Sequence, residues 1–147
     1  MTVGYSGTPL AKKLGIKEGF VVATVNAPGN YLQLLESLPK DVEIDALESV
    51  KPLLTRRLPQ PLDLVHLFTN SRDELFRSLA DLRNAIKQDG SIWVSWYKKA
   101  AKLPTEITED TVREAAFPLG LVDVKVCAVD EKWSGLKLVI RKENRSK

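Results

Sequence analysis

The stretch 118–141 constrains the fold of this chain most, because it has the pattern of two strands joined by one short connection. In its first half, small apolar residues alternate with polar ones and should share one buried face: Val122, Val124, Val126 and Ala128. After the connection 130–134, the alternation resumes with a second apolar set: Leu136, Leu138 and Ile140. The chain is therefore expected to end in an antiparallel β-hairpin, and the residues upstream must supply the sheet that it joins.

Segments of strand character and of helical character alternate upstream of the hairpin. Apolar, β-branched runs predict strands at 20–25, 42–47, 62–68 and 91–97. Leucines at helical spacing, together with capping residues, predict helices at 9–14, 31–38, 71–90 and 109–117. Three prolines in the segment 49–61 interrupt any helix or strand, so a long connection is expected there.

Capping residues mark the helix ends. Asn30 with Gln33 has the capping-box pattern, and the helix that follows should bury a stripe of leucines: Leu32, Leu35 and Leu38. Ser71 with Glu74 has the same pattern. Other helix ends are expected at Gly15, Thr108 and Gly120.

Strands that alternate with helices predict an α/β fold, with a doubly wound and mostly parallel six-stranded sheet covered by helices on both faces. The C-terminal hairpin adds the antiparallel part. This combination resembles the Rossmann-type methyltransferase fold with one strand and its helix lost from 49–61, and it implies the strand order 2-1-3-4-6-5. One domain is expected over 1–141, followed by a flexible, basic and polar tail at 142–147.

Composition narrows the class of protein. None of the apolar runs reaches the roughly 18 residues of a membrane span, and the first residues lack the pattern of a signal peptide, so a cytoplasmic protein is expected. Cys127 is the single cysteine and His66 the single histidine, which argues against a disulfide or a structural zinc site.

Positive charge is concentrated in the tail. Of 22 basic and 19 acidic residues, residues 141–147 hold four basic and one acidic, which leaves 18 of each sign in residues 1–140. Nucleic-acid binding depends on a concentrated basic face, so specific binding of nucleic acid is not expected.

Four segments of the sequence resemble those of an uncharacterised bacterial family, the domain-of-unknown-function 3052 family. They are GYSGTPLAKKLGIKEG at 4–19, SIWVSWYKK at 91–99, EDTVREAAFPLGLVDVKVCAVD at 109–130 and WSGLKLVIR at 133–141. The resemblance spans nearly the whole chain and brings no established activity. The likeness to methyltransferases concerns the fold alone and does not carry a function.

A doubly wound sheet binds ligands outside the carboxyl ends of its strands, so the residues after each strand are the candidates for a binding crevice. They are Asn26, Gly29, Asn30, Thr69, Trp96, Lys98, Lys99, Asp130 and Trp133. No residue is assigned a catalytic role, and no metal ligands are assigned.

The methyltransferase likeness makes S-adenosylmethionine a candidate cofactor. Methyltransferases usually show a GxGxG pattern after the first strand, whereas this chain has Asn-Ala-Pro-Gly-Asn at 26–30, with one glycine. Asp45 or Glu48 could be the acidic residue that binds ribose at the end of the second strand.

Several candidate residues also have a purely structural interpretation. Trp93 and Trp96 should point to opposite faces of one strand and could both be packing residues. His66 lies in mid-strand and is expected to be a buried, neutral core histidine, and Cys127 a small packing residue. Trp133 could form the wall of a pocket or pack over a tight turn.

Three functions remain open from the sequence. The leading hypothesis is a non-catalytic or regulatory binding module on a degenerate methyltransferase-like scaffold, with an unknown small molecule or protein as its partner. The alternatives are a diverged S-adenosylmethionine-dependent methyltransferase and a protein that binds a partner through the segment 49–61.

Overall fold

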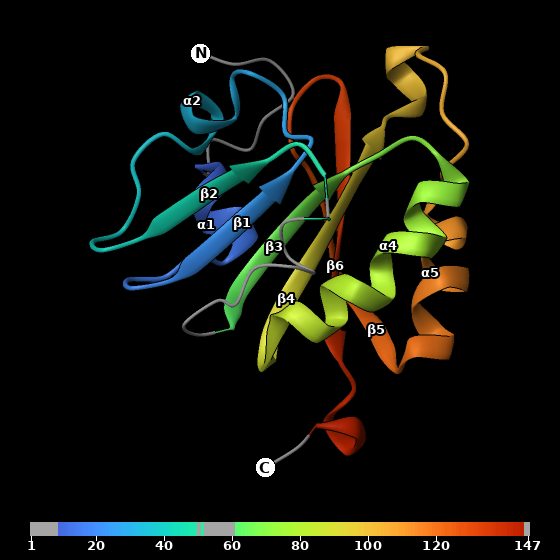
Figure 1. Cartoon of the computed structure of the whole chain (residues 1–147). Coiled ribbons are helices and arrows are strands. Elements are labelled where there is room, and N and C mark those ends of the chain that lie inside the picture. Colours follow the sequence, from blue (N-terminus) through green and yellow to red (C-terminus); the bar gives the residue numbers. More distant parts are fainter. Residues whose placement is uncertain (1–8, 50, 52–60, 146–147) are drawn as a thin grey trace.

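The computed structural model describes residues 9–49, 51 and 61–145, and these residues contain a six-stranded sheet in the order β2-β1-β3-β4-β6-β5 (Figure 1). The strands are β1 Val21–Val25, β2 Glu43–Leu47, β3 Leu62–Phe68, β4 Ile86–Tyr97, β5 Leu121–Ala128 and β6 Trp133–Ile140. β1 to β4 pair in parallel, whereas β6 runs antiparallel to both β4 and β5. The expected fold class, strand order and C-terminal hairpin are therefore confirmed.

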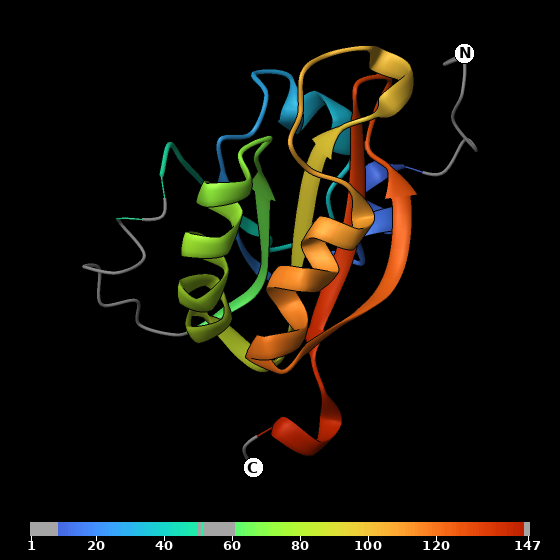
Figure 2. The same ribbon diagram turned by 90° about the vertical axis from the view of Figure 1, so that its right-hand side faces the viewer.

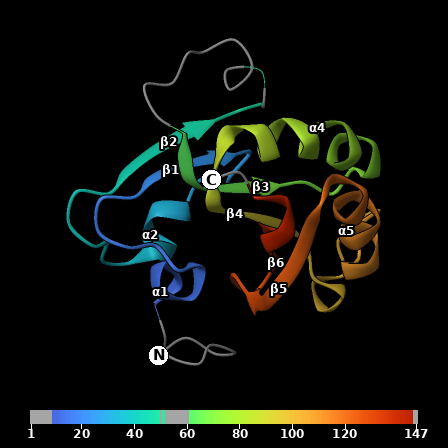
Figure 3. The same ribbon diagram turned by 90° about the horizontal axis from the view of Figure 1, so that it is seen from below.

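Helices cover both faces of the sheet, as Figure 3 shows from below. α1 Leu10–Leu14 and α2 Tyr31–Leu35 lie on one face, and α4 Arg72–Ala85 and α5 Glu109–Ala116 on the other (Figure 2). Three short 3-10 turns complete the described elements: η1 Lys99–Ala101, η2 Phe117–Leu119 and η3 Lys142–Asn144. Each face has its own apolar core, and the two cores share no residue. This is the layered arrangement of a doubly wound fold.

The predicted caps on the second face are present. The side chain of Ser71 accepts a hydrogen bond from the Glu74 backbone N–H at 3.2 Å, which satisfies one of the unpaired donors of α4. Thr108 forms a capping box with Thr111 at the start of α5. Gly120 has φ +76°, the left-handed conformation that ends the helical segment at negligible steric cost. Ser71 and Thr108 therefore mark where α4 and α5 begin, and Gly120 ends the helical segment before β5.

The helix after β1 is shorter than the sequence predicts. It ends at Leu35, and the side chain of Asn30 makes no capping hydrogen bond. Leu32 is 63% exposed and Leu38 is 38% exposed, so the predicted leucine stripe is wrong except at Leu35, which is buried. The first residue, Tyr31, is buried in their place because its side chain reaches the core of the sheet.

β4 begins five positions earlier than predicted, at Ile86, and α4 ends at Ala85 instead of continuing to Gly90. Gly90 permits this early start. A Cβ at position 90 would lie 3.1 Å from the backbone oxygens of Leu62 and Asp63, so only a glycine fits against β3 without displacement. The pairing of β3 with β4 shifts register beside this position, between Leu62 and Leu64.

The predicted buried face of β5 is wrong, although that of β6 is confirmed. Val124 is 55% exposed and Val126 is 54% exposed. β5 is the last strand of the sheet, and its register with β6 shifts between Asp123 and Lys125. Oδ2 of Asp123 lies 3.1 Å from Nε of Arg113 in α5. Val124 and Val126 follow Asp123 in β5, past the point where α5 makes this contact. A period of two predicts which residues share a face, but not whether another element covers that face.

Candidate functional site

Two cavities lie at the edge of the sheet where β1 to β4 end. The first, here called the β1–β2 cavity, has a volume of about 560 Å³ and lies between α2, β1 and β2. The second, here called the hairpin cavity, has a volume of about 600 Å³ and lies beside the turn from β5 to β6. Pro28, in the loop after β1, lines both. The edge predicted from the topology therefore contains hollows large enough for small molecules.

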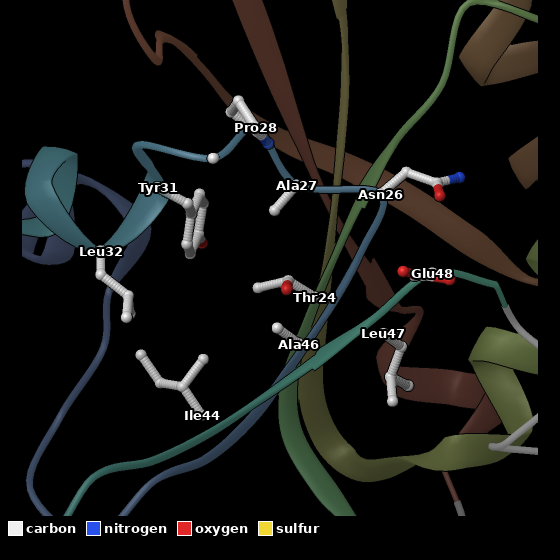
Figure 4. A pocket seen from close by; sticks show the side chains of 11 residues that line it. Thr24, Asn26, Ala27, Pro28, Tyr31, Leu32, Ile44, Ala46, Leu47 and Glu48 are labelled. Atoms are coloured by element: carbon white, nitrogen blue, oxygen red, sulfur yellow. The ribbon is translucent and has the colours of Figure 1, made fainter.

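The β1–β2 cavity has mostly apolar walls (Figure 4). The side chains of Leu32 in α2 and Ile44 in β2 point toward each other, and Ala46 follows on the same face of β2. Polar groups come from Thr24, Tyr31, Asn26 and Glu48. Glu48 directly follows β2 and is the one acidic residue among the lining residues. The cavity thus combines an apolar slot with one carboxylate at its rim.

The loop after β1 leaves its main chain open to a ligand. Asn26 has φ 59°, a left-handed conformation that asparagine tolerates better than most residues, and its N–H donates to the Leu47 carbonyl at 2.9 Å. A Cβ added at Gly29 would meet no atom within 4 Å, so this part of the backbone borders free space. The hydrogen bond of Asn26 ties the loop to the end of β2.

A buried hydrogen-bonded chain supports the wall of the β1–β2 cavity. The Tyr31 hydroxyl lies 2.9 Å from His66 Nδ1, and His66 Nε2 lies 2.7 Å from Ser95 Oγ. His66 and Ser95 are fully buried. Burial lowers the pKa of His66 to about 3, and it raises the pKa of Tyr31 with a smaller contribution from Cys127. His66 is therefore a neutral core histidine, as predicted.

Aromatic side chains form one side of the hairpin cavity. The rings of Trp133 and Tyr97 have centroids 4.5 Å apart, and Phe68 meets Trp133 edge-on at 4.9 Å. Trp133 is half-buried and lines the cavity. Oδ1 of Asp130 accepts hydrogen bonds from the backbone N–H groups of Lys132 and Trp133, both at 2.8 Å. Asp130 therefore stabilises the turn, and Trp133 both packs and faces the cavity.

The structure brings together part of the predicted crevice. Asn26 and Gly29 line the β1–β2 cavity, and Asn30, Asp130 and Trp133 line the hairpin cavity. Four predicted residues line neither of these two: Thr69, Trp96, Lys98 and Lys99.

Of these four residues, Thr69 and Trp96 are buried, and both make structural contacts. Trp96 is 6% exposed and belongs to the core under α4 and α5, whereas Trp93 lies in the opposite core and donates from Nε1 to the Leu14 carbonyl at 3.0 Å. The Thr69 hydroxyl donates to the Glu74 carboxylate. Cys127 packs against the same core as Trp93, and burial raises the pKa of its thiol.

Sequence reasoning missed several walls of the β1–β2 cavity. Tyr31 could have been found as the first helical residue after the loop, and Ile44 and Ala46 from the two-residue period of β2. Thr24 could not be singled out from the sequence, because its strand was expected to be covered by helices on both faces. Of the two acidic candidates for a ribose contact, Glu48 lines the cavity and Asp45 does not.

The described residues contain no group of three or more histidine, cysteine, aspartate or glutamate side chains placed to hold a metal ion. None of the helices within them has the length and hydropathy of a membrane span.

Comparison with protein families gives a match over most of the chain. The model of DUF3052, a protein of unknown function, matches residues 11–142. The chain belongs to the DUF3052 family. The resemblance found in the sequence is thereby confirmed. No curated protein matches the chain.

Solved structures similar to this member of the family include several methyltransferases. A SAM dependent methyltransferase from Aquifex aeolicus has a TM-score of 0.64 at 17% identity, covering 89% of this chain and 87% of its own. The ribosomal protein L11 methylase from Lactobacillus delbrueckii subsp. bulgaricus has a TM-score of 0.61 at 14% identity, covering 90% and 75%. A TehB-like SAM-dependent methyltransferase from Corynebacterium glutamicum has a TM-score of 0.55 at 12% identity, covering 94% and 90%. At these identities the likeness shows a methyltransferase-like Rossmann fold, and nothing about activity.

The residues of the β1–β2 cavity fit one part of S-adenosylmethionine better than the rest. The apolar slot suits a flat ring, and Glu48 is placed at the strand end where a carboxylate can accept hydrogen bonds from ribose hydroxyls. The loop fits less well, because Pro28 has no N–H to donate and Ala27 places a methyl group on the cavity wall. The lining residues therefore match the chemistry of the adenosine part, whereas the glycine-rich loop usual in methyltransferases is missing.

Proposed function

We propose that this chain is a non-catalytic binding module whose β1–β2 cavity takes a small nucleoside-type ligand. The observation that supports this proposal is the placement of Glu48 beside the apolar slot formed by Leu32, Ile44 and Ala46. A purine ring packed in the slot leaves the ribose hydroxyls near the carboxylate. A flat apolar group with hydroxyls at one end matches both halves of the cavity.

The chemistry of the walls supports binding rather than catalysis. Proton transfer at neutral pH needs a group whose pKa lies near 7 and which reaches the ligand. His66 is buried behind Tyr31 with a pKa of about 3, and burial raises the pKa of Tyr31 away from neutrality. Both groups therefore stay neutral, and they support the cavity wall.

Calorimetric titration with S-adenosylmethionine, S-adenosylhomocysteine and adenosine tests the proposal. We expect all three to bind, because the adenosine part makes the decisive contacts. Glu48→Gln should weaken binding about tenfold or more, since a hydrogen bond to a charged group contributes roughly 1.5 to 3 kcal/mol. Glu43→Gln is the matched control, because Glu43 is an exposed acid on β2, the strand that Glu48 follows, and lies outside the cavity. Absence of binding by all three compounds would contradict the proposal.

A diverged S-adenosylmethionine-dependent methyltransferase is the second candidate, favoured by the fold of the structural neighbours. Incubation with S-adenosylmethionine and a cell extract that supplies methyl acceptors distinguishes the two. Transfer of the methyl group to an acceptor in the extract with release of S-adenosylhomocysteine, abolished by Glu48→Gln, would favour the enzyme, and binding without transfer would favour the module. The proposed partner contact through 49–61 lies mostly outside the described residues, and pull-down with and without that segment tests it.

A further inference from the structure

A third cavity lies at the opposite edge of the sheet from the candidate site. It has a volume of about 460 Å³ and forms where α4 ends, where η2 leads into β5, and where β6 leads into η3. In Figure 2 the η3 turn is at the bottom, whereas the loop after β1 and the η1 turn are at the top. We call it the arginine cavity, after its polar lining residues Arg83, Arg141 and Asn144.

The arginine cavity holds positive charge without a matching carboxylate. Its lining residues include two arginines and no aspartate or glutamate. Within the described part of the chain, neither Arg83 nor Arg141 takes part in an ion pair. Two positive charges that line one small cavity repel each other, and an anion bound between them offsets this repulsion.

One atom of Arg83, a residue that lines this cavity, lacks a hydrogen-bond partner. Nε of Arg83 is buried, and among the described side chains it is the one buried nitrogen or oxygen with no partner. Leaving such a donor unpaired destabilises the folded protein, and more so when the group is charged. An unsatisfied buried donor in a native protein commonly marks the place of a water molecule or an ion.

Helix dipoles explain only part of this arrangement. Arg83 lies in the last turn of α4, where a cation interacts favourably with the negative end of the helix. This interaction provides no acceptor for Nε. Arg141 comes from another element, after β6, and its guanidinium lies 5.8 Å from the centroid of the Phe117 ring. The convergence of both side chains therefore needs a further explanation.

We propose that the arginine cavity binds a phosphate monoester through Arg83, Arg141 and Asn144. A guanidinium donates through two parallel N–H groups to phosphate oxygens, and two arginines match the double negative charge of a monoester. The amide of Asn144 adds a neutral donor. The main chain contributes little here, since the Gly120 N–H already donates to the Phe117 carbonyl at 3.1 Å. Phe117 and Leu119 provide an apolar wall for the organic group of the ester.

Titration calorimetry with orthophosphate, phenyl phosphate and acetate at constant ionic strength tests this site. We expect both phosphates to bind, phenyl phosphate more tightly, and acetate at least tenfold more weakly. Arg83→Gln and Arg141→Gln should each weaken phosphate binding at least tenfold. Arg77→Gln is the control, because Arg77 is an exposed arginine of the same helix that pairs with Asp73. Equal loss in the control, equal binding of acetate, or binding of orthophosphate alone would overturn the proposal.

A measurement on the unaltered protein keeps the test valid if the variants do not fold. The Nε–H group of an arginine gives its own signal in ¹⁵N nuclear magnetic resonance spectra. Phenyl phosphate should shift the Arg83 signal downfield, as its buried donor gains an acceptor, and leave the Arg77 signal unchanged. A phosphate titration that moves Arg77 and leaves Arg83 in place would overturn the proposal.

Discussion

The hydroxyl of Tyr31 lies 2.9 Å from Nδ1 of His66, which joins the first residue of α2 to the middle of β3. Tyr31 also lines the β1–β2 cavity, so one side chain connects the cavity wall to the core. On its other side, His66 contacts Ser95 of β4. The wall is thus held through three elements by two hydrogen bonds that solvent does not reach.

Tyr31→Phe should lower the free energy of unfolding by about 1 to 3 kcal/mol, because it leaves a buried nitrogen of His66 without its partner. Urea denaturation measures the change. Tyr97→Phe is the matched control, since Tyr97 is only half-buried and no hydrogen bond of its hydroxyl is found within the described residues. Equal effects of the two substitutions would contradict the importance of the buried contact.

Stability should fall with pH below about 6.5, because His66 is the single histidine and its folded-state pKa is about 3. The unfolded chain takes up a proton near pH 6.5, whereas the native protein excludes it until near pH 3. The free energy of unfolding should therefore decrease by up to about 1.4 kcal/mol for each pH unit below this value.

Denaturation between about pH 6.5 and 5 measures this slope before most carboxylates titrate. His66→Gln should remove most of the slope while lowering stability throughout the range. If the variant kept the slope of the wild type, the neutral buried histidine would not be its source.

Gly29→Ala should leave stability within about 0.5 kcal/mol of the wild type, because the added methyl group meets no atom and the backbone is not left-handed. Gly29 lines the cavity where the ligand is proposed to lie, so the added methyl group should weaken adenosine binding. Gly90→Ala gives the opposite result, since its Cβ would lie 3.1 Å from two backbone oxygens. Calorimetry and thermal unfolding of both variants separate a ligand-facing glycine from a structural one.

Val126→Lys should change stability by less than about 0.5 kcal/mol, whereas Leu136→Lys should lower it by several kcal/mol. The two residues are directly paired across β5 and β6, but Val126 is 54% exposed and Leu136 is 2% exposed. Chemical denaturation of the two variants measures the difference. A large loss from Val126→Lys would show that another surface covers β5 in solution.

The sequence predicted the strand order because strands that alternate with helices leave few topologies for a sheet ending in a hairpin. Helix caps such as Ser71 and Thr108 were predictable because they depend on neighbours within three residues. The exposure of Val124 was not, since it depends on how far α5 extends over β5.

The candidate site could be placed at an edge of the sheet but not assembled from the sequence. The sequence alone did not distinguish Glu48 from Asp45 as a ribose contact. Only the structure shows that Glu48 lines the cavity. Trp96 follows the same rule for strand ends, yet its face is covered by α4 and α5. Burial of this kind depends on contacts between distant elements, which local patterns do not contain.

The position of β2 has a consequence for the motions of the site. β2 is an edge strand, with β1 as its one neighbouring strand among the described residues, and all five of its residues are exposed or half-buried. Strands with few buried contacts open locally at a lower free energy than the core, so their amide hydrogens exchange faster with solvent. A ligand between α2 and β2 would slow this exchange by holding the strand closed. The β2 amides are therefore a built-in reporter of occupancy, readable by hydrogen–deuterium exchange without any label on the ligand.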